Sequence, residues 1–457
     1  MKQRTALRAS FVCRECGGTV SKWQGQCPSC GAWNTLEEAV LEPRTASRSG
    51  GDVAPGRGRR ATLDGVAAEA SSRWGSGLPE LDRVLGGGLV PGAVILIGGD
   101  PGIGKSTLML QVLAAVAQER RALYVSGEES ASQVAARGAR LRLDVSRLQM
   151  LAETCLDVII ADIEREPVDL LVLDSIQTLY SESLGSAPGS VAQVRECAGM
   201  IVRAAKERAM AAILIGHVTR EGSIAGPRIL EHLVDTVIYF EGEPGSSIRV
   251  LRGLKNRFGS VNEIGVFAMD ETGLRPVSNP SALFMARGGM TGPGVVLLAT
   301  LEGSRPLLVQ VQALVDRSAG TPRRVCTGFD AQRLSMLLAV MNRHLGMELG
   351  GFDVYVNIVG GLRINEPAAD LAIILAVWSS MTSRPLPADL ATFGEVGLAG
   401  EVRPVVGGQL RLAEARQLGV GLVIGAPCGN RRSTTSAMRY QPVRSVGETL
   451  EAVRQLS

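Results

Sequence analysis

The fold of this chain is decided by the stretch Gly98-Gly99-Asp100-Pro101-Gly102-Ile103-Gly104-Lys105-Ser106-Thr107. From Gly99 to Ser106 it fits the pattern G-x-x-x-x-G-K-[ST], and it stands between the apolar run 94–97 and the helix-forming segment 108–117. A strand that feeds a glycine turn and then a helix aims successive backbone N–H groups at phosphate oxygens, and the helix N-terminus adds partial positive charge. The stretch therefore predicts a nucleoside triphosphate site formed by residues 99–107.

Individual residues of this loop have distinct expected tasks. Lys105 is expected to reach the β- and γ-phosphates, and the Ser106 hydroxyl to ligate Mg²⁺. Gly102 and Gly104 let the backbone approach the phosphates because they carry no Cβ.

The segments that follow the loop alternate between strand and helix patterns. Near-continuous apolar strands in such an alternation indicate a parallel sheet covered on both faces, with ligands at the carboxyl ends of the strands. The expected strands are 122–126, 169–174 and 211–217, and the expected helices are 130–140, 154–166 and 190–209.

Polar residues stand at the predicted carboxyl ends of these strands. Asp174 ends an apolar run, where a carboxylate can hold the magnesium shell through water. Glu128 and Glu129 follow the strand 122–126, and either of them is placed to polarise the water that attacks the γ-phosphate. His217 is expected to sense the γ-phosphate or to be a satisfied polar residue at a strand end. The Gly-containing segment after it is expected to become ordered when nucleotide or a polymer binds.

Further along the chain, the segments 248–254 and 261–269 read as a hairpin that encloses Lys255-Asn256-Arg257-Phe258-Gly259. Two cations two residues apart on an extended chain point the same way. This geometry suits Lys255 and Arg257 to grip a phosphate of a neighbouring subunit, as an arginine finger does in trans. A solvated basic hairpin tip is the alternative.

Residues 1–40 contain two cysteine pairs, Cys13-x-x-Cys16 and Cys27-x-x-Cys30. Four thiolates complete the tetrahedral shell that Zn²⁺ accepts, so a structural zinc finger without catalytic function is predicted. Disulfides or redox pairs are the alternative, which a reducing compartment disfavours. Trp23 and Trp33 are expected to pack on the finger.

Composition and charge narrow the cellular setting. The 457 residues carry 48 basic and 45 acidic side chains, a net charge of +3, so nucleic-acid binding has to come from local clusters. No apolar run approaches the 18 or so residues of a membrane helix, and no hydrophobic signal core follows the basic N-terminus. We expect a cytoplasmic protein with no membrane partner. The segment 41–60, rich in Gly, Ser and Arg, reads as a flexible basic linker or as a phosphate-tracking arm.

A second domain is expected from about residue 281 to 457. Its predicted elements are strands 309–315 and 354–359, helices 330–345, 367–380 and 409–418, and a tight hairpin in the Gly-rich segment 394–400. It shows no Ser–His–Asp or metal-binding constellation.

Together these motifs resemble one group of proteins. The phosphate loop, the acidic strand end and the segment Ser76-Gly77-Leu78-Pro79-Glu80-Leu81-Asp82-Arg83-Val84-Leu85-Gly86-Gly87-Gly88 resemble the RecA/KaiC group of ATPases. With the four-cysteine finger and the pentapeptide KNRFG, almost the whole chain resembles the bacterial RadA (Sms) family. The resemblance implies an α/β fold with a RecA-like P-loop ATPase core at 61–278, after a zinc finger at 1–40. A C-terminal α+β domain resembling the Lon protease is implied at 281–457.

The resemblance also implies residue roles. Lys105 and Ser106 match the Walker A positions and Asp174 the Walker B aspartate, while Glu128 matches the catalytic glutamate better than Glu129 does. Lys255 and Arg257 match a family motif required for motor activity. The catalytic set so implied is Lys105, Glu128, Asp174, Lys255 and Arg257.

The C-terminal domain departs from Lon at its reactive positions. Lon's Gly-Pro-Ser-Ala-Gly motif appears as Glu366-Pro367-Ala368-Ala369-Asp370, with Ala368 in place of the serine, and the catalytic lysine falls on Arg411. Alanine has no nucleophile, and a guanidinium with a pKa above about 12 cannot act as a base at neutral pH. A proteolytically inactive domain that serves assembly and DNA contact is implied.

The function that the resemblance implies is an ATP-driven DNA motor of recombination and repair. It would be a homo-hexameric ring that uses ATP, Mg²⁺ and Zn²⁺, binds single-stranded and branched DNA, and promotes branch migration with the RecA recombinase. An ATP-dependent Lon-like protease is an alternative that Ala368 opposes. A KaiC-like regulatory ATPase is another, although such proteins lack both the finger and the Lon-like domain.

Overall fold

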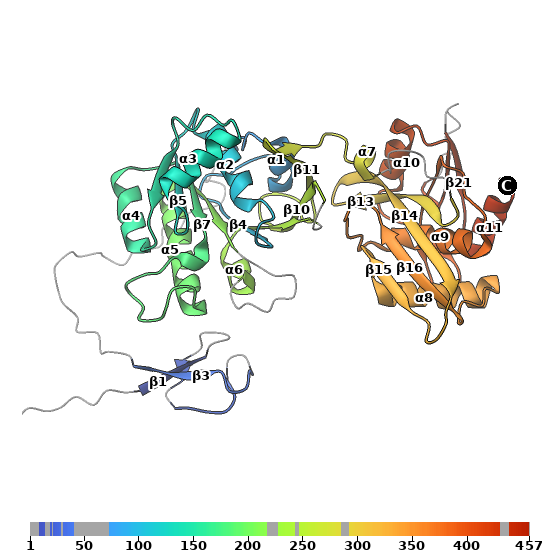
Figure 1. Cartoon of the computed structure of the whole chain (residues 1–457), viewed down its shortest axis with the longest axis horizontal. Coiled ribbons are helices and arrows are strands. Elements are labelled where there is room, and N and C mark those ends of the chain that lie inside the picture. Colours follow the sequence, from blue (N-terminus) through green and yellow to red (C-terminus); the bar gives the residue numbers. More distant parts are fainter. Residues whose placement is uncertain are drawn as a thin grey trace, which may run out of the picture. The chain divides into compact units, whose positions relative to one another are not determined.

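The computed structural model describes residues 9–13, 19–20, 22–28, 31–40, 73–216, 227–242, 246–284, 292–429 and 438–456 (Figure 1). The chain divides into two compact units. The first comprises Met1–Glu241, Leu251–Val261 and Met269–Leu274, and the second comprises Gly242–Val250, Asn262–Ala268 and Arg275–Ser457.

A small antiparallel sheet lies near the N-terminus. Its strands, in the order β2-β1-β3, are β1 (Ala9–Cys13), β2 (Thr19–Val20) and β3 (Leu36–Val40). Cys13 lies opposite Leu36 in the ladder, and both side chains are buried together with Cys27. Trp23 and Trp33 are 57% and 69% exposed, so the expectation that they pack on the finger is wrong. Among the described residues, the core here consists of Cys13, Cys27 and Leu36 with Phe11 and Val20 packed against them, and it includes neither indole.

A nine-stranded sheet, in the order β12-β11-β10-β9-β4-β8-β7-β5-β6, contains the strands of the first unit, and parts of β10, β11 and β12 are grouped with the second unit. The six strands from β9 to β6 are parallel. The strands are β4 (Val94–Gly99), β5 (Ala122–Ser126), β6 (Gln149–Ala152), β7 (Leu170–Asp174), β8 (Ala211–Ile215), β9 (Thr236–Glu241), β10 (Ile248–Asn256), β11 (Ile264–Asp270) and β12 (Gly273–Pro276). The helices are α1 (Pro79–Leu85), α2 (Lys105–Val116), α3 (Ala131–Arg140), α4 (Leu156–Arg165), α5 (Val191–Arg208) and α6 (Pro227–Leu233), with a 3₁₀ turn at Ile176–Thr178.

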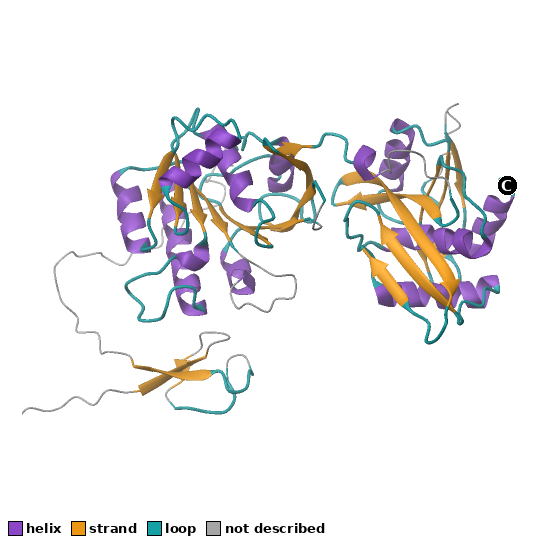
Figure 2. Cartoon of the chain, in the orientation of Figure 1, coloured by secondary structure: helices purple, strands orange, loops and turns teal. Residues whose placement is uncertain are grey.

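The central strands β4, β5, β7 and β8 are buried on both faces, which explains their nearly continuous apolar sequence, whereas the edge strand β6 is partly exposed. Val94 and Leu96 belong to one core with residues of α4, α5 and α6. Ile95 and Ile97 alternate with them, so they point to the opposite face, where α2 contacts β5 and β7. Figure 2 shows the helices packed beside these strands. The expected parallel, doubly covered sheet is therefore present, with the P-loop at the carboxyl end of β4.

The second unit contains a mixed seven-stranded sheet in the order β15-β16-β14-β13-β17-β20-β21. These strands are β13 (Val295–Glu302), β14 (Arg305–Arg317), β15 (Arg324–Thr327), β16 (Phe352–Ile358), β17 (Leu390–Phe393), β20 (Leu422–Gly425) and β21 (Arg439–Pro442). A two-stranded ribbon, β18 (Glu395–Val396) with β19 (Val402–Arg403), forms the expected hairpin in the Gly-rich segment. The helices are α7 (Ser281–Phe284), α8 (Ala331–Leu345), α9 (Asp370–Thr382), α10 (Gly408–Gln417) and α11 (Val446–Arg454), with a 3₁₀ turn at Pro367–Ala369.

Helix α9 lies in the centre of the core of this unit. Every residue from Leu371 to Val377 is at most 1% exposed, so the helix is apolar on all sides because it is surrounded on all sides. It is 13 residues long. Within the described parts of the chain, none of the helices combines the length and apolar composition needed to span a lipid bilayer.

Candidate nucleotide site and its distant partners

The phosphate loop joins β4 to α2 through a backbone that requires glycine. Gly99 and Gly104 have φ of 149° and 116°, in the region that L side chains rarely adopt. A Cβ on Gly99 would lie 2.6 Å from the Phe240 carbonyl oxygen, and one on Gly104 would lie 2.6 Å from Cε of Met269. The loop is therefore pressed against β9 and β11, which fixes its shape before a phosphate binds.

Lys105, the first residue of α2, is only 4% exposed. Its Nζ donates hydrogen bonds to the carbonyl oxygens of Gly99 at 2.7 Å and Asp100 at 2.9 Å. Burial lowers the pKa of Lys105, while the carboxylates of Asp174, Asp100 and Glu128 act in the opposite direction. The ammonium group thus lies across the loop and donates to two neutral carbonyl groups. Charged phosphate oxygens are stronger acceptors, so a bound phosphate would compete for these hydrogen bonds.

Asp174 lies where the sequence places it, at the last position of β7. Its Oδ2 accepts a hydrogen bond from the hydroxyl of Tyr124 at 2.7 Å. Burial and the neighbouring Asp174 raise the pKa of Tyr124, so the phenol remains a donor at neutral pH. The carboxylate is oriented in this way, and with the Ser106 hydroxyl it provides the oxygen donors that suit Mg²⁺.

The two glutamates after β5 have different neighbours. Glu129 forms an ion pair with Arg137 of α3. Glu128 accepts a hydrogen bond from the Ser175 hydroxyl at 3.1 Å, next to Asp174 in the chain. Both line a pocket of about 300 Å³. Glu128 is therefore linked to the end of β7, which carries Asp174, whereas Glu129 is paired with Arg137 of α3. This difference favours Glu128 as the residue that orients the attacking water.

Tyr124 and Ser175 were not identified from the sequence. Tyr124 is the one residue with a polar tip in the otherwise apolar run of β5 before Ser126, and a buried tyrosine usually finds a partner for its hydroxyl. That signal was available. The contact of Ser175 with Glu128 joins residues 47 positions apart, and no local pattern predicts it.

Strand β10 extends through Lys255 and Asn256, so these two residues are part of the strand and not of the hairpin loop. Asn256 is buried, and its side chain contacts the Thr236 hydroxyl at 3.3 Å and donates to the Val84 carbonyl at 3.3 Å. A Cβ on Gly259 would lie 3.0 Å from Cα of Gly86. The Asn and Gly of the pentapeptide thus lock it against α1 and its C-terminal glycine.

The two cations of the pentapeptide contact the same short segment, which runs from the last turn of α6 to the start of β9. Lys255 Nζ donates to the carbonyl oxygens of Glu231 at 2.6 Å and Val234 at 2.8 Å. Arg257 Nη1 lies 3.2 Å from Oδ1 of Asp235, and the arginine side chain is 53% exposed. Burial, together with Arg257, lowers the pKa of Lys255. As the alternation rule predicted, both side chains point the same way.

Lys255 and Arg257 lie at the amino ends of the parallel strands, whereas the P-loop lies at their carboxyl ends. Asp235 Oδ2 accepts the N–H of Val94, the first residue of β4, whereas Gly99 is the last residue of that strand. Five residue steps along a strand span about 17 Å. Lys255 and Arg257 therefore lie far from the phosphate loop of their own chain.

Of the predicted zinc ligands, Cys13 and Cys27 are described and both are 1% exposed. The N–H of Gly31 donates to the carbonyl oxygen of Cys27 at 2.8 Å, which closes the turn after this cysteine. These features fit a metal knuckle. Cys16 and Cys30 lie outside the described residues, and so does His217 with the segment up to residue 226.

The positions that match the reactive residues of Lon are buried and differently used. Ala368 is 1% exposed. Arg411, also 1% exposed, donates to both carboxylate oxygens of Glu366, at 2.7 and 2.6 Å, and to the Ala299 carbonyl at 2.8 Å. Glu366 Oε1 also accepts the N–H of Leu301 at 2.9 Å. A closed bidentate ion pair thus occupies the place where a protease would hold its lysine.

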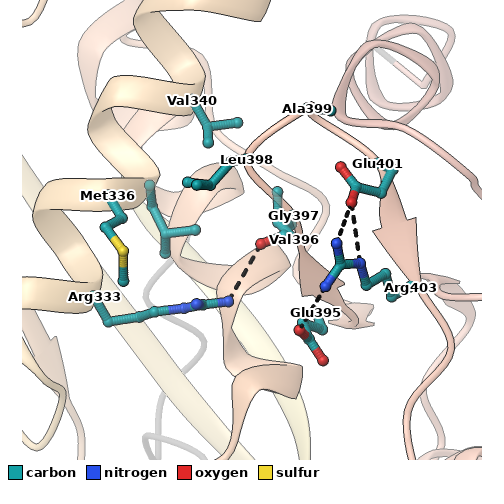
Figure 3. A pocket seen from close by; sticks show the side chains of 11 residues that line it. Arg333, Met336, Val340, Glu395, Val396, Gly397, Leu398, Ala399, Glu401 and Arg403 are labelled. Atoms are coloured by element: carbon teal, nitrogen blue, oxygen red, sulfur yellow. Dashed lines mark hydrogen bonds and ion pairs between the residues drawn. The ribbon is translucent and has the colours of Figure 1, made fainter.

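A larger pocket of about 460 Å³ lies in the second unit between α8 and the β18–β19 ribbon (Figure 3). Arg333 pairs with the buried Asp370 and donates to the Val396 carbonyl. Arg403 pairs with Glu401 and Glu395 on the other side. The pocket lining contains no Ser, Thr, Cys, His or Lys, and its carboxylates Glu395 and Glu401 both pair with Arg403.

Three family models match the chain, each in a different part. A rubredoxin metal-binding domain matches residues 11–38, an AAA domain matches residues 66–223, and the C-terminal proteolytic domain of Lon protease (S16) matches residues 348–451. The fold class is therefore a RecA-like P-loop core that follows a zinc ribbon and precedes a Lon-like domain, as predicted.

Similar proteins cover nearly the full length. The DNA repair protein RadA of Pseudomonas aeruginosa is 53% identical, over 97% of this chain and 98% of its own. RadA of Salmonella typhimurium is 50% identical, over 99% of each chain. Among solved structures, the RadB recombinase matches 44% of this chain and 99% of its own with 21% identity and a TM-score of 0.37.

Proposed function

The chain belongs to the RadA family of DNA repair proteins, and from that premise we propose that it is a DNA-dependent ATPase that works as a hexameric ring. The ring moves on single-stranded and branched DNA and promotes branch migration of recombination intermediates together with the RecA recombinase, in the cytoplasm. ATP is bound between adjacent subunits.

The observation that carries the intersubunit site is the separation of the two halves within one chain. Lys255 and Arg257 lie at the amino edge of β4 and β9, about 17 Å from the phosphate loop at the carboxyl edge. A cation pair that cannot reach its own nucleotide needs a phosphate from another chain. A contact between different faces of identical subunits closes into a ring when its rotation permits.

Each residue of the composite site has a defined task. Lys105 and the backbone N–H groups of the loop hold the β- and γ-phosphates. The Ser106 hydroxyl and the Asp174 carboxylate would hold Mg²⁺, which neutralises charge that develops on the phosphates. Glu128 accepts a proton from, and orients, the attacking water. Lys255 and Arg257 of the next subunit stabilise the charge of the transition state.

The remaining parts serve DNA handling and assembly. His217 senses the γ-phosphate, and the segment after it responds to DNA, although both lie outside the described residues. The cysteine ribbon holds one zinc ion as a structural site, supported by the burial of Cys13 and Cys27. The Lon-like domain is proteolytically inactive and contributes to assembly and DNA contact, supported by Ala368 and by the closed pair of Arg411 with Glu366.

ATPase rates with and without single-stranded DNA test this function in the wild type, Lys105→Ala and Lys255→Ala. We expect DNA to stimulate the wild type, Lys105→Ala to abolish turnover, and Lys255→Ala to lower turnover at least about a hundredfold while ATP still binds. Arg121→Ala is the control, because Arg121 forms an exposed pair with Asp169 at the same edge of the sheet. The proposal would be contradicted if DNA did not change the ATPase rate of the wild type, or if Lys255→Ala promoted branch migration as well as the wild type does.

A further inference from the structure

Asp235 lies immediately before β9, at the edge of the sheet that carries Lys255 and Arg257. It is 3% exposed, and it contacts the pentapeptide although the two are more than 20 residues apart in the chain. Nothing in its local sequence marks it as functional, because Leu-Val-Asp-Thr reads as the start of an ordinary strand.

The carboxylate of Asp235 has two sides with different partners. Oδ1 lies 3.2 Å from Arg257 Nη1 and 3.8 Å from Lys206 Nζ. Oδ2 accepts the backbone N–H of Val94 at 3.1 Å. In addition, the carbonyl oxygen of Asp235 accepts the backbone N–H of Arg257 at 3.1 Å. The backbone and the side chain of Asp235 therefore hold Arg257 at both ends.

This arrangement restricts an otherwise mobile side chain. A free arginine loses rotamer entropy when it is ordered, so a partner that already holds it reduces what binding must order. The carboxylate is fixed by burial and by the Val94 N–H, so it gives the guanidinium a stationary partner. Because the arginine remains 53% exposed, a face of it is still available to a second anion.

We propose that Asp235 is a positioning residue for Arg257, which it holds ready to contact the triphosphate bound by the adjacent subunit. This inference rests on the intersubunit site proposed above. Asp235 does not touch the nucleotide and acts through the arginine, so its loss slows turnover and leaves the P-loop of its own chain intact. The same contacts admit a competing role, in which Asp235 serves its own P-loop strand through Val94.

The first test is the DNA-stimulated ATPase rate of the full-length Asp235→Asn variant. Asparagine keeps an oxygen for the Val94 N–H and removes the charge that faces Arg257. We expect kcat to fall at least about tenfold and KM for ATP to change less than about threefold. The double variant Asp235→Asn/Arg257→Ala should be no slower than Arg257→Ala alone, since both changes remove one interaction. Additive losses would overturn the inference.

Asp169→Asn is the matched control. Asp169 lies immediately before β7, accepts the backbone N–H of Arg121 at 3.0 Å and pairs with its guanidinium. It makes the same two kinds of contact as Asp235, on a more exposed carboxylate, and neither contact involves the pentapeptide. Its kcat should stay within about twofold of wild type. Equal losses in the two variants would assign the effect of Asp235→Asn to the sheet edge and overturn the inference.

Mixing experiments separate the two roles of Asp235. Lys105→Ala subunits have no working P-loop but an intact Arg257, so they rescue a partner whose defect lies in the arginine. Asp235→Asn mixed with Lys105→Ala should regain ATPase activity to the same degree as Arg257→Ala mixed with Lys105→Ala. If only the Arg257→Ala mixture regains activity, Asp235 serves its own chain and this inference fails. If neither mixture does, the intersubunit site itself fails.

Discussion

Arg411 shows how one residue changes the use of a site. A lysine has one compact charge, whereas the guanidinium presents a planar fork that matches a carboxylate on two atoms. Arg411 donates hydrogen bonds to Glu366 and to the carbonyl oxygens of Val406 and Ala299. Its guanidinium cannot serve as the basic amine that a lysine would provide at this position. We expect this ion pair to contribute to the structure of the second unit, in keeping with the proposal that the domain is not a protease.

Replacement of Arg411 by lysine is predicted to destabilise the second unit by about 2–4 kcal/mol, because Glu366 would lose half of its buried partners. Amide hydrogen exchange in α10 measures the effect in this unit alone. Arg403→Lys is the control: its pair with Glu401 is half-exposed and should change exchange by less than about 0.5 kcal/mol. Equal effects in the two variants would show that Arg411 is not a structural ion pair.

The two glutamates after β5 give a second prediction at this scale. Glu128→Gln should lower kcat at least about a hundredfold and leave ATP binding intact, because it removes the proton acceptor for water. Glu129→Gln should lower kcat much less, since it removes a partner of Arg137. Single-turnover hydrolysis with nucleotide-binding titrations measures both. The reverse ranking would move the catalytic role to Glu129.

The sequence was sufficient for residues whose position depends on local order. The P-loop and Asp174 lie where the sequence predicts them, at the ends of β4 and β7, because spacing along the chain fixes their geometry. Ser175, Asp235 and the pairing of Glu366 with Arg411 could not be predicted, because their partners lie 47, 22 and 45 positions away. The exposure of Trp23 and Trp33 was also missed, since the small core that excludes them appears only in three dimensions.

At the scale of elements, the pentapeptide and α1 pack together as one unit of structure. Asn256 donates to the last turn of α1, Gly259 packs on Gly86, and the guanidinium of Arg73 donates to the Phe258 carbonyl at 2.6 Å. The strand end that carries Lys255 is therefore anchored to the segment that precedes the P-loop strand. The pentapeptide and α1 are far apart in the sequence, but they pack together, and α1 supports the pentapeptide.

Gly259→Ala tests this support. The added Cβ would lie 3.0 Å from Gly86 Cα and 3.1 Å from Asn256 Nδ2, so the turn must shift. We predict about 1–2 kcal/mol of destabilisation and a several-fold lower kcat with unchanged ATP affinity. Gly199→Ala in α5 is the control: no atom lies within 4 Å of its added Cβ, and it should be neutral or stabilising. An unchanged kcat in Gly259→Ala would contradict the supporting role.

At the scale of the whole molecule, the proposed ring follows from the two halves of an ATP site that each chain is inferred to carry but cannot bring together. The phosphate loop lies at the carboxyl edge of its sheet, and the cation pair of Lys255 and Arg257 lies at the amino edge. In the ring that we propose, assembly supplies the missing half to every site. Hydrolysis in one subunit would then be coupled to the position of its neighbour, which is the requirement for a motor that moves on a polymer.

The most direct measurement is DNA-stimulated ATP hydrolysis in mixtures of Lys105→Ala subunits with Lys255→Ala/Arg257→Ala subunits. Each variant alone should be inactive. In a ring with random exchange, activity should rise to about a quarter of the wild-type rate at equal proportions, because one adjacent pair in four then combines an intact loop with an intact cation pair. A mixture that remains inactive at every ratio, although the subunits co-assemble, would contradict the intersubunit site.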